Sequence, residues 1–418
     1  MDRIRSGLFS AITNVPFRAG KLAIERVNSQ TMDSNPALCL VFFSERYADP
    51  ELVHGIIQKI NPDVVAGCST NGEIAAGYWR ESVIAISLST DFMRFGIAVE
   101  ANEKLANAND GIVYEDFYKR ALTDLRNKLL FQENKMVLPV NPKHMNPDFG
   151  LLFLPGTDPD SEPKANTVIQ GLRKYLGEIP LIGGSIGDDY NYENGYVIFK
   201  DEFLENHTLL ILGRSDLEFS MAQIHGYHIK KEFTVTKAIN NRIVSLNNEP
   251  ASLVYFRELN LPVVEISDLR DEICALNPFG IKDQSTGELQ ILFPMSRGKE
   301  AKELTVSQVI PEGATIYFTE AELDGAKKAS LDAIKKAYVD GAIKDPRLGI
   351  LFSCGGRSTF YFDRALAEIE EIKNRFKYTN IGGAYLYGTL CGKNNWISEG
   401  SSSVLLIGNE LRRRPKIK

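Results

Sequence analysis

The sequence predicts an α/β protein whose mixed β-sheets are built from repeated β-α-β-turn-β units, arranged as two halves flanked by helices. Three observations support this fold class. Three segments of the chain follow one plan, each begins with an apolar run typical of a buried strand, and each ends in a glycine-containing turn. The 418 residues are therefore copies of one plan and not unrelated domains joined end to end.

The first unit begins with the apolar run LCLVFF at residues 38–43. Asp49 followed by Pro50 is a typical helix start, and apolar residues then recur at helical spacing as far as Ile60. A second apolar strand leads into the turn sequence GCSTNGEI at residues 67–74. This order predicts strand, helix, strand and turn.

The second and third units repeat this order. The offset from the strand phenylalanine to the first glycine of the turn is 25, 30 and 30 residues for Phe42, Phe153 and Phe352. These offsets indicate a shared ancestor, with a shorter strand-to-helix loop in the first unit. The strand, helix and turn segments are 150–156, 164–176 and 183–189 in the second unit, and 348–357, 363–376 and 382–388 in the third.

Another apolar run follows each glycine turn, at residues 82–88, 195–199 and 402–407. The interval is short enough for a hairpin, so we expect the sheets to be mixed and not purely parallel. Residues 92–99 and 217–224 are predicted to be further strands.

Two longer helices are expected between the units, starting at Tyr114 and Ala321. We place the domain boundary near Ser215, where the second glycine unit finishes. An N-terminal domain of residues 1–215 then holds two units. A C-terminal domain of residues 216–418 holds one unit, added strands and a short basic tail.

Composition and charge exclude several classes of function. The formal charge is −6, which disfavours nucleic acid as the main partner because phosphate neutralisation needs an excess of basic residues. No segment has the length and apolarity of a membrane span or of a signal peptide. The five cysteines are odd in number, widely spaced and without CxxC pairs, so we expect a reducing, cytoplasmic setting and no zinc site.

Six separated motifs carry a family resemblance. They are GCSTNGEI from Gly67, GGSIGDD from Gly183, VTKAINNRIVSLNNEPA from Val235, FPMSRG with the later PEGATIYF, LFSCGGR from Leu351, and GGAYLYG from Gly382. In this order they resemble the FIST sensory proteins, in both the N-terminal and the C-terminal parts of that family, from about residue 36 to residue 408.

The resemblance implies a non-catalytic sensory module that binds a small molecule such as an amino acid or a small carboxylate. Relatives are often joined to kinase, cyclase or chemotaxis output domains, and some bind haem and report nitric oxide to a partner histidine kinase. We expect a stand-alone sensor that signals to a separate protein, because the chain ends soon after its last strand. The family's Tyr-Gly-Glu motif reads Tyr387, Gly388 and Thr389 here, so a carboxylate for a ligand's ammonium group is missing at that position.

Ligand-binding residues are predicted at the glycine turns, because glycine lets a backbone approach a ligand and exposes amide donors. We place the best pocket in the C-terminal half, where Arg357 could grip a carboxylate with two tyrosines as walls. Alternatively, Arg357 caps a helix or pairs with Asp363. The predicted residues are Gly67, Cys68, Ser69, Thr70, Gly183, Gly184, Ser185, Cys354, Gly355, Gly356, Arg357, Gly382, Gly383, Tyr385, Tyr387 and Gly388.

Two alternative functions remain open from the sequence. Cys68 could be the nucleophile of an enzyme, although a buried, inert cysteine is the more frequent case and no base is identified. A haem-based sensor would need one accessible imidazole, which the pattern does not single out. We expect no catalytic and no metal-binding residues, and we interpret Asp188 and Asp189 as solvated turn residues. The histidines are His54, His144, His207, His225 and His228.

Overall fold

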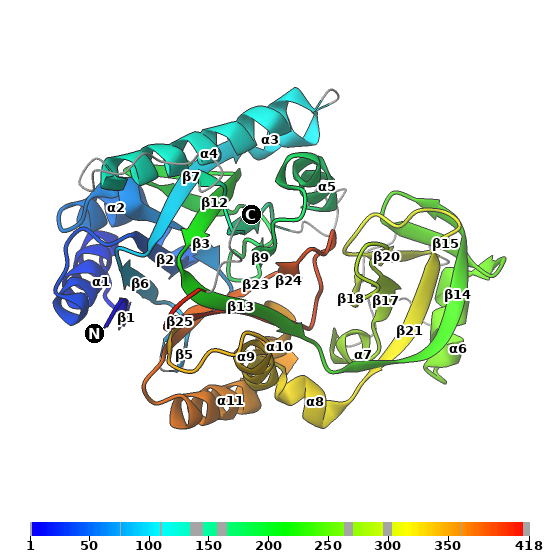
Figure 1. Cartoon of the computed structure of the whole chain (residues 1–418). Helices are drawn as coiled ribbons and strands as arrows, with labels where there is room; N and C mark the ends of the chain where they lie inside the picture. The colour runs from blue at the N-terminus through cyan, green and yellow to red at the C-terminus, as the bar shows by residue number, and fades with distance from the viewer. Residues whose placement is uncertain are drawn as a thin grey trace.

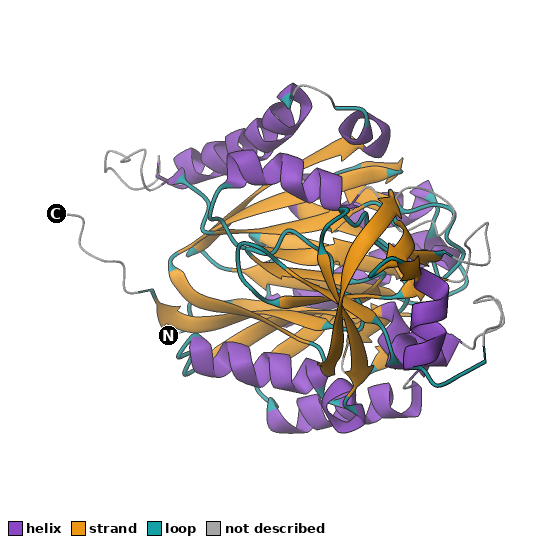
Figure 2. Ribbon diagram, turned by 90° about the vertical axis from the view of Figure 1, so that its right-hand side faces the viewer, coloured by secondary structure: helices purple, strands orange, loops and turns teal. Residues whose placement is uncertain are grey.

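The computed structural model describes residues 2–75, 77–108, 111–133, 145–156, 165–262, 271–295, 303–360 and 362–412. Three sheets form the main body, and helices cover them on the outside (Figures 1 and 2). A fourth sheet stands to one side of this body in Figure 1. The mixed α/β class is therefore confirmed.

The first unit covers residues 5–89. Its elements are β1 (Arg5–Ala11), α1 (Pro16–Thr31), β2 (Leu38–Ser44), α2 (Pro50–Ile57), β3 (Val65–Thr70), β4 (Glu73–Ala75), β5 (Tyr78–Trp79) and β6 (Val83–Ser89).

The second unit repeats this order with one additional short helix. Its elements are β7 (Met93–Ala101), α3 (Asn102–Ala106), α4 (Ile112–Glu133), β8 (Phe149–Leu154), α5 (Ala165–Leu176), β9 (Leu181–Ser185), β10 (Tyr196–Phe199), β11 (Glu202–Glu205) and β12 (His207–Ser215).

The third unit is interrupted after its first strand. Its elements are β13 (Leu217–Ile224), α8 (Leu323–Lys327), α9 (Ala329–Asp340), β22 (Pro346–Cys354), α10 (Gly355–Phe360), α11 (Phe362–Arg375), β23 (Asn380–Leu386), β24 (Thr389–Gly392) and β25 (Ser402–Leu411).

The interruption is the fourth sheet, which has its own hydrophobic core. We call residues 227–321 the insert. Its elements are β14 (Tyr227–Ile239), β15 (Arg242–Leu246), β16 (Glu249–Pro250), α6 (Ala251–Glu258), α7 (Asp271–Leu276), β17 (Phe279–Lys282), β18 (Leu289–Leu292), β19 (Pro294–Met295), β20 (Leu304–Val306) and β21 (Thr315–Ala321).

The three main sheets share one strand order. The first is β1-β6-β2-β3-β10-β11, the second is β7-β12-β8-β9-β24, and the third is β13-β25-β22-β23-β4-β5. In each sheet the first four strands come from one unit. The remaining strand or strands come from another unit, so every unit lends a strand to a neighbour: the first to the third, the third to the second, and the second to the first.

The prediction of a hairpin after each glycine turn is wrong. Strand β6 pairs with β2, β25 pairs with β22, and β10 pairs with β3 of the first unit. The chain crosses to a neighbouring sheet after each turn, and the strand that ends each unit pairs antiparallel with the unit's central strand. The sheets are still mixed, because each central strand is parallel to the strand that precedes the turn.

Strand β2 shows why these sequences form buried strands. Every residue of LCLVFFS is buried, because one face of the strand meets helices and the other meets the other sheets. Asp49 starts the following helix as predicted, since its side chain accepts a hydrogen bond from Glu51 N. Corresponding helices cover the other two main sheets.

Phe42, Phe153 and Phe352 meet where the three main sheets face one another. Their ring centroids lie 5.8, 5.7 and 5.4 Å apart, with tilted or edge-on geometry. Each ring contacts both others, which is a favourable arrangement for aromatic quadrupoles. These are the strand phenylalanines of the three sequence repeats, so they mark a pseudo-threefold axis through the main body.

Candidate functional site

The carboxyl-terminal ends of the strands of all three units meet and are joined by backbone hydrogen bonds. Asn71 N donates to Tyr385 O at 2.9 Å, which links the first unit to the third. Tyr387 N donates to Ser185 O at 2.9 Å, and Asp189 N donates to Thr70 O at 3.2 Å. These bonds close a ring of contacts between the third, second and first units.

The glycines of the turns are explained by close backbone approach. A Cβ added at Gly67, Gly183 or Gly383 would lie 1.8, 2.0 or 1.8 Å from a carbonyl oxygen of the neighbouring central strand. Such distances do not occur, so only glycine fits there. Gly184 and Gly382 are enclosed as well, by Gly388 O at 2.1 Å and Leu8 Cδ1 at 2.5 Å. Packing of the strands accounts for these predicted ligand-lining residues.

Asn71 stands at the centre of the meeting point, and the residue is 1% exposed. Its Oδ1 accepts hydrogen bonds from Asp188 N at 3.2 Å and Tyr190 N at 3.3 Å. Within the described residues, its Nδ2 has no hydrogen-bond partner. A buried amide donor without a partner is costly, and such a group in a native protein calls for an explanation.

Asp188 fixes the loop that follows β9. Its carboxylate accepts from the hydroxyl of Tyr387 and from the backbone N–H groups of Tyr192, Glu193 and Asn194 at 3.1, 2.7 and 3.1 Å. The side chain is 3% exposed. The interpretation of Asp188 as a solvated turn residue is therefore wrong, because the carboxylate is a buried acceptor that orders its loop.

Tyr190 joins this loop to the third unit. Its hydroxyl donates to Gly355 O at 2.8 Å and lies 2.9 Å from Ser358 Oγ. A Cβ added at Gly355 would lie 3.0 Å from both Asn71 Nδ2 and Tyr190 Oη, so the glycine lets these two side chains pack closely against the start of α10. We call Asn71, Asp188, Tyr190, Gly355 and Tyr387 the axial cluster. Each of the three units contributes to it.

The loop after β9 has an unusual backbone. Asp189, Tyr190 and Tyr192 have φ of 54°, 70° and 58°. Left-handed conformations are uncommon for residues other than glycine, asparagine and aspartate, and they persist only where surrounding contacts impose them. Here Asn71 and Asp188 impose them through the hydrogen bonds described above.

Acidic groups lie on one side of the axial cluster. Asp189 Oδ2 accepts from Glu45 N at 2.8 Å. Burial, together with the charges of Glu45 and Asp188, raises the pKa of Asp189 to about 6. Burial also raises the pKa of Glu45. Carboxyl groups with raised pKa values favour a cation as a neighbour, because a positive charge would stabilise their ionised forms.

Arg357 does not point toward this cluster. Its guanidinium pairs with Glu368 Oε2 at 2.7 Å, donates to Ser353 Oγ at 3.0 Å, and donates to Ala326 O. The side chain is 5% exposed and lies between the third sheet and its helices. The side chain of Asp363, the partner considered from the sequence, lies outside the described residues. The guanidinium that we predicted to bind a ligand carboxylate is thus already paired with the Glu368 carboxylate.

The other predicted site residues divide into two groups. Gly355 and Tyr387 belong to the axial cluster, and Ser69 adjoins it by donating to Gly187 O at 2.6 Å. Tyr385 instead packs with the helix layer of the third unit. Of the remaining predicted positions, Gly356 is partly exposed. The others are buried, namely Cys68, Thr70, Ser185, Cys354 and Gly388.

Sequence reasoning missed Asn71 and Tyr190 and misjudged Asp188. A signal for Asn71 was present, because Asn71, Gly187 and Tyr387 each lie four positions after the enclosed glycines Gly67, Gly183 and Gly383. Comparison of the repeats from these glycines would have placed them at equivalent positions around the axis.

The described part of the chain shows neither a metal-binding cluster nor a membrane-spanning helix. No group of three or more His, Cys, Asp or Glu side chains there could hold a metal ion. Among the same residues, no helix is long and apolar enough to cross a bilayer.

Comparison with known families identifies the chain. Residues 37–249 match the FIST N domain, and residues 253–391 match the FIST C domain. The chain belongs to the FIST family. FIST domains are sensory domains linked to signal transduction. The boundary between the two matches lies in the insert, whereas the sequence-based boundary near Ser215 separates β12 from β13 and stays a prediction.

Individual relatives of this FIST protein add little about its ligand. An uncharacterized protein, MJ1623 of Methanocaldococcus jannaschii, is 24% identical over 305 residues, which is 70% of this chain and 55% of the relative. The chain thus spans about half the length of this curated relative.

Two solved structures resemble the fold weakly. Cyanuric acid hydrolase from A. caulinodans has a TM-score of 0.37 at 10% identity, over 97% of this chain and 99% of the other. PurLQS from Thermotoga maritima has a TM-score of 0.22 at 10% identity, over 98% and 73% of the two chains. Scores this low support no argument about function.

Proposed function

We propose that this FIST protein is a sensor that binds a small amino acid, or a related small carboxylate, at the axial cluster. The observation that carries the proposal is the Asn71 Nδ2 donor, which is buried without a partner among the described residues where the three units meet. A ligand carboxylate oxygen would supply the missing acceptor.

The acidic side of the cluster supports a ligand that also carries an ammonium group. Asp189 and Glu45 have raised pKa values, and a ligand cation would stabilise their charged forms. In this proposal they take the place of the carboxylate that Thr389 does not provide. A carboxylate and an ammonium group are the two charged groups of an amino acid.

We propose that the signal passes to an output protein such as a histidine kinase or a cyclase, in the cytoplasm. A sensor role follows from the family, and the five cysteines suit a reducing compartment because all are buried and free. All three units contribute to the axial cluster, so a ligand there would alter the contacts between units, and this change is the physical basis of the proposed signal.

The geometry gives less support to the alternatives. Cys68 is buried in the core between the main sheets, and burial raises the pKa of its thiol, which opposes formation of a nucleophilic thiolate. For haem, His54 and His228 lie near Glu51 and Glu320 at the surface. His225 is more enclosed, and burial lowers its pKa. His144 lies outside the described residues, and the haem hypothesis stays a prediction.

The test is isothermal titration of the full chain with the common amino acids and with small carboxylates. We expect at least one amino acid to bind, and Asn71→Ala or Asn71→Asp to weaken its binding at least about ten-fold, equal to 1.4 kcal/mol. Asn107→Ala, an exposed asparagine after α3, is the matched control and should bind as the wild type does. The proposal is wrong if no compound binds, or if both Asn71 variants bind normally.

A further inference from the structure

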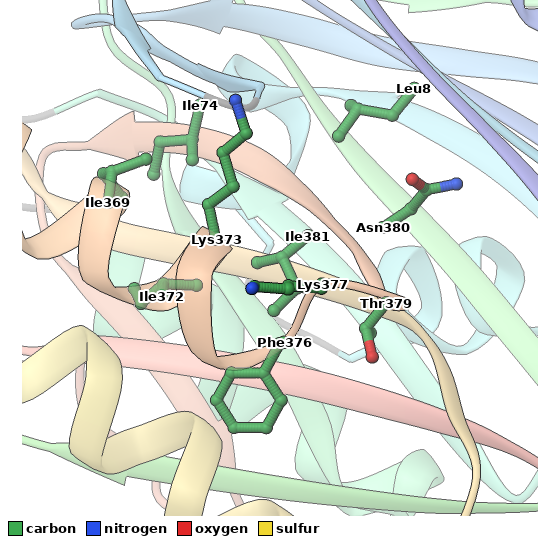
Figure 3. A pocket seen from close by; sticks show the side chains of 10 residues that line it. All are labelled: Leu8, Ile74, Ile369, Ile372, Lys373, Phe376, Lys377, Thr379, Asn380 and Ile381. Carbon is green, nitrogen blue, oxygen red and sulfur yellow. The ribbon is translucent and has the colours of Figure 1, made fainter.

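A hollow lies at the joint between the first and third units. It has a volume of about 140 Å³ and is open to solvent on one side. Figure 3 shows its walls, which come from β1, β4, α11 and the start of β23. The axial cluster contributes none of its lining. The lining residues are Leu8, Ile74, Ile369, Ile372, Lys373, Phe376, Lys377, Thr379, Asn380 and Ile381.

The floor of this hollow is formed by apolar, branched side chains. Ile74, Ile369, Ile372 and Ile381 are buried and belong to one hydrophobic cluster. Ile74 comes from the strand β4 that the first unit lends to the third sheet, where it pairs with Gly383. The floor therefore exists only because two units are assembled here, and it suits the body of an aliphatic ligand.

Two lysines provide the charge at this hollow. Lys373, in the last turn of α11, and Lys377, two residues after the end of α11, are exposed, and the lining contains no acidic residue. Neither lysine forms an ion pair with any described residue, although Arg375, the last residue of α11, pairs with Glu371 at 2.8 Å. Unpaired ammonium groups above an apolar floor are complementary to an organic anion.

The polar lining residues are already engaged. Asn380 Nδ2 donates to Ser6 O at 2.8 Å, and Thr379 Oγ1 donates to Pro346 O at 2.9 Å. They cannot hold a ligand with these atoms without losing contacts to neighbouring segments. The lysines are therefore the groups that would recognise the charged end of an occupant.

We propose that this hollow binds a small branched aliphatic carboxylate, with its methyl groups on the isoleucine floor and its carboxylate between Lys373 and Lys377. The volume sets the size, because a dry apolar cavity of about 150 Å³ accommodates a molecule such as benzene. Isocaproate has a body of that order and one carboxylate. This site is independent of the function proposed for the axial cluster.

The test uses isocaproate as the probe and the uncharged isocaproamide, which has the same shape, as its matched ligand. In calorimetric titrations of the full chain we expect one isocaproate site and at least ten-fold weaker binding of the amide. The double variant Lys373→Gln/Lys377→Gln should bind isocaproate at least ten-fold more weakly. Arg375→Gln removes a neighbouring cation that does not line the hollow and should change nothing.

Three outcomes would contradict the proposal. No isocaproate binding, or equal binding of the acid and the amide, would overturn the proposal. Normal binding by the double lysine variant would place the probe elsewhere and would also overturn it. Both lysines are exposed, so their replacement should leave the fold intact, and circular dichroism of the variant checks this. Asn71→Ala should leave isocaproate affinity unchanged, which separates this site from the axial cluster.

Discussion

Glu399 is a buried acid at the contact between the main body and the insert. It lies between β24 and β25, is 7% exposed, and accepts hydrogen bonds from Phe293 N and from Ser307 Oγ at 2.7 Å. Burial raises its pKa from 4.5 to about 8. The carboxyl is therefore neutral in the folded protein near neutral pH, whereas it is ionised in the unfolded chain.

The sign of the pH effect follows from proton binding. Between pH 4.5 and about 8, the folded state holds a proton at Glu399 that the unfolded state has lost, so stability falls as the pH rises through this interval. One pKa unit corresponds to about 1.4 kcal/mol, so the free energy of unfolding falls by roughly 3 to 5 kcal/mol across this interval. We expect Glu399→Gln to remove this loss, because an amide cannot ionise.

The measurement is urea unfolding of wild type and Glu399→Gln at a series of pH values. Glu73, another buried acid with a pKa raised to about 7, titrates in both proteins, so the difference between the two curves isolates Glu399. That difference should grow in favour of the variant from pH 5 to pH 8.5. A constant difference across this range would contradict the assignment.

At the residue scale, the sequence predicted positions better than roles. The glycine turns were located, and their glycines are needed because strands approach closely at Gly67, Gly183 and Gly383. The role of Arg357 could not be predicted, because its partner Glu368 lies on another element whose position depends on the fold. Likewise, the pattern around Asp188 is common in exposed turns, and nothing local marks its burial.

At the element scale, one buried ion pair joins the short helix α10 to α11. Arg357 of α10 pairs with Glu368 of α11, and Glu368 Oε1 also accepts from Ser330 N at 2.7 Å at the start of α9. Both charged side chains are nearly inaccessible to water. Removing one partner leaves the other charge buried and unpaired, which is the costly case for such pairs.

We expect Arg357→Met to lower the free energy of unfolding by about 3 to 5 kcal/mol. The double variant Arg357→Met/Glu368→Leu should recover part of that loss, because no unpaired charge remains. Arg375→Met, which breaks an exposed pair with Glu371 on the same helix, should cost less than about 1 kcal/mol. Urea unfolding at pH 7 measures all three.

A small effect of Arg357→Met would show that the guanidinium is not a structural cation. In that case the ligand-binding role predicted for Arg357 from the sequence would regain support. The same titration as for Asn71 applies here. A loss of amino-acid binding by Arg357→Met in a fully folded protein would also support a ligand-binding role for Arg357.

The repeated strands and helices were predictable, but their pairing was not. Apolar runs and helical spacing located β2, β8 and β22 because these signals are local. The exchange of β4, β10 and β24 between sheets is not encoded locally, since a short interval between two apolar runs reads equally well as a hairpin. Pairing over long sequence distances depends on the assembly of all three units.

At the scale of the whole molecule, two segments leave the sheet of their own unit and return to the point where they left. Tyr227 and Ala321, the ends of the insert, are paired across β14 and β21. Gly195 and Asn206, which flank β10 and β11, are joined by a backbone hydrogen bond of 2.8 Å. The insert has a core of its own, whereas Val197 and Ile198 of β10 lie in cores of the main body.

This difference predicts opposite results for two deletions that are geometrically alike. Replacing residues 228–320 by a short Gly-Ser linker should leave the main body folded, because the ends to be joined are already neighbours. The cost should be about 2 to 4 kcal/mol from lost hydrogen bonds such as Glu399 N to Ile291 O at 3.0 Å. Replacing residues 196–205 in the same way, although far shorter, should abolish cooperative unfolding, because it removes the strand that the second unit lends to the first sheet.

Near-UV circular dichroism and thermal unfolding distinguish the outcomes. The protein without residues 228–320 should keep its tertiary signal and a cooperative transition, and the protein without residues 196–205 should lose both. If the large deletion also unfolds the main body, the insert is an integral part of the core despite its separate sheet. If the small deletion is tolerated, strand exchange is dispensable, and the three units are held together mainly by the contacts of Phe42, Phe153 and Phe352 around the axis.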